Sequence, residues 1–79
     1  KSMTTNLCDV ASDLPVRIKV LKGEPQLCHR LREMGFCEFA KIRKISENGG
    51  LICDVCGVRI ALSRRLAKNI LVEAIDPSL

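Results

Sequence analysis

Apolar and charged residues alternate in one stretch of the N-terminal third of the chain. Val16, Ile18 and Val20 are separated by Arg17 and Lys19. This two-residue period predicts a strand, over residues 16–21, with one face in the core and cations on the other. Four more stretches have the composition of short strands. They cover residues 39–45, with its cations expected on one face, 51–55, 58–62 and 70–75.

A helical period follows the first strand. Leu27, Leu31 and Met34 stand at positions i, i+4 and i+7, which places them on one face of a helix. Gly35 comes directly after the last of them and suits the left-handed backbone that ends many helices. The spacing therefore predicts a short amphipathic helix over 26–34.

Turn and cap residues separate the remaining elements. Asn48-Gly49-Gly50 and Gly57 accept positive φ and predict tight turns, and residues 7–14 have room for one short turn. Ser63 can cap a short helix over 64–69. The order is strand, helix, three strands, helical turn, strand. We therefore expect a mainly β fold, a small, partly open β-barrel of about five strands with an inserted short helix and a short helical turn before the last strand.

Composition narrows the class of protein. The 79 residues allow one small domain, and Phe36 and Phe39 are the only aromatic residues. The core must then be aliphatic, and rings that would stack on nucleic acid bases are scarce. The net charge of +4 comes from dispersed basic residues, so no nucleic acid partner is expected. We expect one domain over 7–75, between a flexible N-terminus or expression remnant at 1–6 and a frayed C-terminus at 76–79.

The sequence also bears on location and catalysis. No apolar stretch approaches the ~18 residues of a membrane span, and the first ten residues lack the apolar core of a signal peptide. We therefore expect a cytoplasmic protein with reduced thiols. His29 is the only histidine, and nothing in the sequence arranges it as a base for a thiolate. The turn at 48–50 leads into a strand instead of a phosphate-binding helix, so neither catalysis nor nucleotide binding is expected.

The cysteines leave two interpretations open. Five are present, which is an odd number for a disulfide framework: Cys8, Cys28, Cys37, Cys53 and Cys56. Cys53 and Cys56 are spaced like one half of a zinc knuckle, and a local turn would be needed to bring the two thiols together. In the alternative, Cys53 packs in the core beside Leu51 and Val55, and Cys56 is an exposed thiol at a turn.

Two segments carry a family resemblance. Residues 30–36, Arg-Leu-Arg-Glu-Met-Gly-Phe, resemble the helix-to-glycine motif of FeoA, a small cytosolic protein of bacterial ferrous iron transport. Residues 57–62, followed by 67–70, resemble the second motif of that family. The two motifs have the order and spacing of the family, and the resemblance covers roughly residues 7–75.

This resemblance implies an SH3-like barrel with a helix inserted after the first strand. It also implies a non-enzymatic role beside FeoB, a membrane iron permease with a cytosolic GTPase domain, whose transport or GTPase cycle the protein would modulate. The protein would then lie in the cytoplasm, at the inner face of the membrane through this partner. We expect the partner to contact the helix and its exit through Arg30, Arg32, Met34 and Phe36. The alternative is that Met34 packs in the core and the arginines are merely solvated.

A second hypothesis uses the cysteines. Cys53 and Cys56 would hold a transition metal, zinc or ferrous iron, in a metal or redox sensor. The first hypothesis requires no cofactor, although its family makes association with a transition metal ion worth testing. A homodimer is compatible with both hypotheses.

Overall fold

Six strands, two short α-helices and one 3-10 turn make up the part of the chain that the computed structural model describes, residues 4–47 and 50–75. They are β1 (Thr5–Asn6), η1 (Leu7–Asp9), β2 (Pro15–Leu21), α1 (Pro25–Glu33), β3 (Lys41–Ser46), β4 (Leu51–Val55), β5 (Val58–Leu62), α2 (Arg64–Ala67) and β6 (Ile70–Ala74). The predicted turn at 48–50 lies mostly outside the described residues, as do the predicted C-terminal end at 76–79 and the first three residues of the chain.

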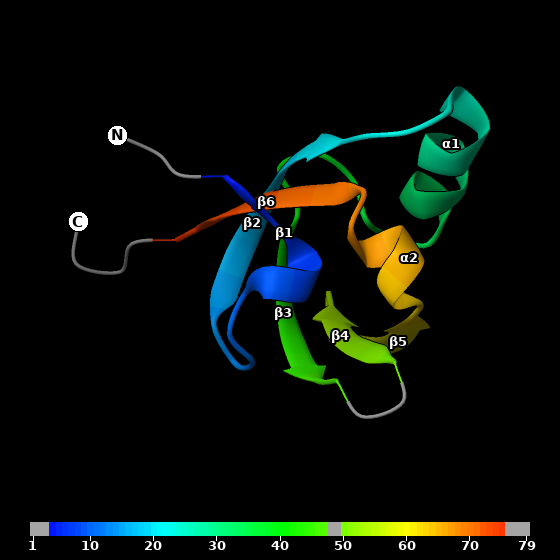
Figure 1. Ribbon diagram of the computed structural model, residues 1–79. Coiled ribbons are helices and arrows are strands. Elements are labelled where there is room, and N and C mark those ends of the chain that lie inside the picture. The colour runs from blue at the N-terminus through cyan, green and yellow to red at the C-terminus, as the bar shows by residue number, and fades with distance from the viewer. Residues whose placement is uncertain (1–3, 48–49, 76–79) are drawn as a thin grey trace.

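The strands form one antiparallel sheet in the order β1-β6-β2-β3-β4-β5. The sheet curls around the core, and η1 and α2 lie beside each other between β6 and the β4–β5 hairpin (Figure 1). The Cys8 thiol of η1 donates a hydrogen bond to the Arg64 carbonyl of α2 over 3.3 Å. The mainly β prediction is confirmed, with six strands instead of about five. The additional strand is β1, whose two residues are too few to show an alternating pattern.

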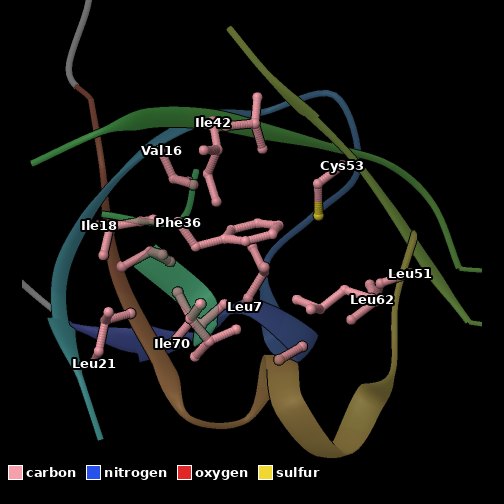
Figure 2. Close-up of a cluster of buried hydrophobic side chains, with 14 of the residues drawn as sticks. Leu7, Val16, Ile18, Leu21, Phe36, Ile42, Leu51, Cys53, Leu62 and Ile70 are labelled. Carbon is pink, nitrogen blue, oxygen red and sulfur yellow. The ribbon is translucent and has the colours of Figure 1, made fainter. Parts of the chain in front are cut away.

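The core is aliphatic around a single aromatic ring. Phe36 is fully buried, and its ring lies in the middle of side chains from several strands and from η1 (Figure 2). The residues around it come from β2, β3, β4, β5 and β6, and they include Val16, Ile18, Ile42, Leu51, Leu62 and Ile70. The two-residue alternation correctly placed Val16 and Ile18 in the core. It is wrong for Val20, which is 45% exposed, because the pairing of β2 with β6 shifts register between Ile18 and Val20.

The α1 helix ends in a Schellman motif, in which the last turn is closed by two reversed hydrogen bonds. Gly35 has φ +105°, and its N–H donates to the Arg32 carbonyl over 3.0 Å. The Phe36 N–H donates to the Leu31 carbonyl over 2.9 Å. The predicted role of Gly35 is confirmed. Leu31 is buried, whereas Met34 is only half-buried.

The β4–β5 hairpin turns on two residues. Cys56 has φ +55° and Gly57 has φ +82°, which is the backbone of a type I′ turn. The Asp54 carboxylate accepts a hydrogen bond of 3.0 Å from the Gly57 N–H and supports the turn. The predicted tight turn at Gly57 is confirmed.

The structure differs from the predicted strand at 39–45 in two ways. Phe39 has φ +71°, its N–H donates to the Ile18 carbonyl over 2.7 Å, and the strand begins only at Lys41. The prediction that the cations lie on one face is wrong for Lys44, whose side chain is fully buried while those of Lys41 and Arg43 are exposed.

Two further elements are shorter than predicted. The helix predicted over 64–69 is assigned only to Arg64–Ala67, and Ser63 caps it through a hydrogen bond from the Leu66 N–H to the serine hydroxyl. The last strand ends at Ala74 instead of residue 75. Neither helix of the described residues has the length and apolar character needed to span a membrane.

Candidate partner-binding surface

The four residues predicted to bind a partner fall in different environments. Arg30 is exposed on α1, and Met34 is half-buried at the C-terminal cap of the helix. Arg32 is also exposed and forms an ion pair with Glu38. Phe36 has no exposed surface, because the chain turns back after Gly35 and places the ring in the core. Phe36 therefore does not belong to the surface that a partner could contact.

The Arg32–Glu38 pair joins α1 to the segment that leaves it. The guanidinium donates from Nε to Oε1 over 3.1 Å and from Nη2 to Oε2 over 2.7 Å, a two-pronged contact that fixes both groups. The hydrogen bonds from Arg32 lower the pKa of Glu38 to about 2. The arginine that the sequence placed at the partner surface is thus already occupied by a carboxylate of its own chain.

Phe39 is the exposed residue that sequence reasoning missed. It follows Glu38 directly, and 73% of it is accessible to solvent. An exposed aromatic ring is a common anchor in protein interfaces because it brings a large apolar area and loses little conformational freedom on binding. The only signal in the sequence was the count of two aromatic residues, of which one fills the core. We call the set Arg30, Arg32, Met34, Glu38 and Phe39 the α1 exit surface.

Other charged side chains of α1 are less distinctive. His29 and Glu33 are both exposed and lie 3.3 Å apart, one helical turn from each other. This is the ordinary i, i+4 pairing of a solvated helix face. His29 therefore has the surroundings of a surface histidine.

Cys53 and Cys56 lie in different environments. Cys53 is fully buried, and burial raises the pKa of its thiol to about 11, which opposes the thiolate that a metal requires. Cys56 is exposed on the hairpin turn. Within residues 4–47 and 50–75, no three His, Cys, Asp or Glu side chains are placed to hold one ion. The described residues thus give the predicted metal pair no supporting ligands.

A shallow cavity of about 290 Å³ lies next to the hairpin turn. Its lining is Pro15, Lys41, Ile42, Arg43, Asp54 and Cys56. The Arg43 guanidinium and the Asp54 carboxylate form an ion pair of 3.3 Å there. The lining offers a thiol and charged groups, and it contains no histidine that would activate the thiol.

A buried lysine connects distant parts of the chain. Lys44 Nζ donates to the Cys8 carbonyl over 3.0 Å and to Glu47 Oε1 over 2.9 Å. The other oxygen of Glu47 accepts from Arg64 over 3.3 Å. This network satisfies the buried ammonium group and holds η1, β3 and α2 together.

Comparison with known proteins shows which family and which solved structures share this fold. The model of the FeoA domain family matches residues 5–74. None of the curated proteins matches the chain. Among solved structures, the chain is similar to an iron uptake regulatory protein (FeoA), with 25% identity and a TM-score of 0.86 over 92% of this chain and 99% of the other.

Two other solved structures show the range of this fold. The iron(II) transport protein A from Clostridium thermocellum has 28% identity and a TM-score of 0.81, over 90% of this chain and 46% of the other. ScaR with bound Zn²⁺ has 20% identity and a TM-score of 0.81, over 90% of this chain and 37% of the other. The similarity to ScaR is a similarity of fold alone.

Proposed function

The chain belongs to the FeoA domain family, and from this membership we propose that it is a non-enzymatic accessory protein that regulates ferrous iron uptake. The family implies involvement in ferrous iron transport, and the structural matches confirm the expected SH3-like fold. The match of the family model over residues 5–74 is the observation that carries the proposal. The similar protein of known structure is itself named an iron uptake regulatory protein.

The proposed partner is the cytosolic part of an FeoB-type iron permease, whose transport or GTPase cycle this protein modulates. It acts in the cytoplasm, at the inner face of the membrane through that partner, and it requires no bound cofactor. The environment of His29 supports a non-catalytic role, since the only histidine of the chain is exposed and pairs with Glu33.

The α1 exit surface is the proposed contact. Arg30 offers a charge, Phe39 offers an apolar ring, and the Arg32–Glu38 pair holds the segment between them in place. Aromatic residues and arginine are both enriched in the centre of protein interfaces. Arg32 contributes mainly by fixing Glu38, because its guanidinium is already bound.

A pull-down of the permease's cytosolic region tests this surface. We expect the combined substitution Arg30→Glu and Phe39→Ser to reduce recovery about tenfold or more, which corresponds to ~1.4 kcal/mol of binding free energy or more. The exposed Arg65 of α2 provides a matched control, and Arg65→Glu should bind like the wild type. Equal recovery of the double variant and the wild type would remove the α1 exit surface from the proposal. Failure of the wild type to bind would remove the partner.

No observation favours the hypothesis of a cysteine-based metal or redox sensor over this one. Cys53 lies in the core with a raised thiol pKa, and Cys56 lies on an exposed turn. Zinc or ferrous iron would need ligands that the described residues do not gather around either thiol.

A further inference from the structure

The two edges of the sheet are protected to very different degrees. β1 forms one edge and has only two residues, Thr5–Asn6. β5 forms the other edge and has five, Val58–Leu62, in continuous register with β4. It contains no proline and no bulge. Long, regular edges of this kind present unpaired backbone groups that can accept another strand, and natural sheets usually block them.

The hairpin register shows which backbone groups of β5 are unpaired. The two-residue turn makes Val55 and Val58 a closing pair, and hydrogen-bonded pairs then alternate along the hairpin. Arg59 and Ala61 occupy the intervening positions, so their N–H and C=O groups point away from β4. Both residues are exposed, and neither forms a backbone hydrogen bond outside the hairpin within the described residues. Four backbone groups are thus available for strand pairing.

The side chains of β5 present different chemistry on its two faces. Val58 is 58% exposed, and Ile60 on the same face packs only partly against the core. Arg59 points to the opposite face, beside Asp54 in the register. Asp54 already binds Arg43 and the Gly57 N–H, and no ion pair of Arg59 is found within the described residues. A strand added here would have an apolar surface on one side and an unpaired cation on the other.

We propose that β5 binds an extended segment of a partner protein by strand addition, and that acidic and apolar residues alternate in this segment. Backbone hydrogen bonds to Arg59 and Ala61 supply affinity, and the alternating side chains supply selectivity. Carboxylates of the segment lie beside Arg59, with Arg43 on the same face, while its apolar residues cover Val58.

A second copy of the chain fits this edge less well. The charged residue of β5 is Arg59, and pairing two β5 strands brings two such guanidinium groups onto one face with no acidic residue between them. Charge complementarity therefore favours an acidic segment. This inference does not rest on the proposed function, because it is argued from β5 and uses no residue of the α1 exit surface.

The probe is a fluorescently labelled heptapeptide in which four valines alternate with three glutamates, compared with the same peptide carrying lysines in place of glutamates. We expect anisotropy titrations of the wild-type protein to show at least tenfold tighter binding of the glutamate peptide. Hydrogen exchange of the Arg59 and Ala61 amides should slow at least tenfold in its presence. Equal binding of the two peptides, or unchanged exchange at both amides, would overturn the proposal.

Variants of the edge separate strand addition from simple charge attraction. Ala61→Pro removes one outward N–H without removing a bond to β4, and it should weaken binding at least tenfold, whereas Ala61→Val should bind like the wild type. Arg59→Glu should reverse the preference toward the lysine peptide. If Ala61→Pro retains a native spectrum and full binding, strand addition is excluded.

Modified peptides test strand addition without any change to the protein. N-methylation of the three glutamates, or of the three valines that follow the first one, blocks opposite edges of the peptide. Strand addition requires one pattern to abolish binding and the other to preserve it, and equal behaviour of the two would contradict it. Dimerisation of the free protein with contacts between two β5 strands would also contradict it, since the occupant would then be a second copy.

Discussion

Lys44 shows how one residue can join parts of the chain that are far apart in sequence. Its side chain is fully buried, and its ammonium group donates to a carbonyl 36 positions earlier, that of Cys8. The second partner, Glu47, is partly exposed and shared with Arg64. A buried charge is tolerated when hydrogen bonds replace its lost hydration. Lys44 therefore belongs to the structural core although its chemistry is that of the surface.

Replacing Lys44 with Met tests this role. The substitution keeps an unbranched side chain one atom shorter than lysine, and it leaves the Cys8 carbonyl without its donor. We expect it to lower the free energy of unfolding by about 1–3 kcal/mol, the cost of an unsatisfied buried polar group. Urea denaturation measures the change. Lys41→Met on the exposed face should stay within about 0.5 kcal/mol of the wild type, and a similar result for Lys44→Met would show that the network adds no stability.

The sequence pattern predicted the strand in which Lys44 lies, but it did not predict that the side chain of Lys44 is buried. Ile42 is two positions away on the same face and is buried, and it lies within the strand predicted over 39–45. The pattern assigns every lysine to solvent, because a strand considered alone has no partner to offer an ammonium group. The partners are the Cys8 carbonyl of η1 and the side chain of Glu47, which follows β3, and the contact with η1 exists only in the tertiary structure.

At the scale of elements, the exit of α1 decides where the neighbouring chain can lie. Gly35 has φ +105°, and a Cβ added to it would lie 3.1 Å from the Cγ1 atom of Val55. The glycine therefore serves two purposes, left-handed backbone and close approach of the helix to β4. Both place Phe36 in the core and Glu38 within reach of Arg32.

Gly35→Ala should consequently destabilise the protein by about 1–3 kcal/mol through backbone strain, with further cost from contact with Val55. Gly57→Ala is the matched control, since Gly57 also has positive φ but an added Cβ would meet no atom within 4 Å. Chemical denaturation of both variants separates the two effects. If Gly57→Ala is as destabilising as Gly35→Ala, the contact with Val55 contributes nothing.

The elements around this exit differ in how far they could be predicted. The α1 helix, the glycine that ends it and the turn of the β4–β5 hairpin all follow from local signals in the sequence. Arg30 was correctly expected on the exposed side of α1. The burial of Phe36 also had a local signal, because the residue after a Schellman glycine commonly packs against its own helix. Phe39 had none. Its backbone is set by a hydrogen bond to the Ile18 carbonyl of β2, which periodicity cannot report.

At the scale of the whole molecule, acidic side chains hold two separate regions. Glu38 forms an ion pair with Arg32 of α1 and holds the segment that leaves the helix against it. Glu47 forms an ion pair with Lys44 of β3. The pKa of each carboxyl is lowered, chiefly by the hydrogen bond from its basic partner. Protonation of either group in acid removes these attractions.

Stability should therefore fall in acid. A carboxyl whose pKa is lower in the folded protein contributes fully above its ordinary pKa, 4.5, and the contribution disappears as pH falls through the folded value, about 2 for Glu38. We expect Tm to decrease between pH 4.5 and 2, as followed by circular dichroism. Glu38→Gln should lose less Tm over this interval than the wild type. Identical pH profiles for the two proteins would show that Glu38 is not coupled to folding.

The place of β6 in the sheet affects how the protein is made in the cell. β6 is the last strand along the described chain, yet it pairs with both β1 and β2 (Figure 1). A ribosome releases the N-terminal elements first, so β2 emerges long before one of its two neighbours exists. Until Ile70–Ala74 leave the exit tunnel, β1 has no partner and one edge of β2 is open to incorrect pairing. The nascent chain therefore exposes an edge of β2 that β6 covers in the finished protein.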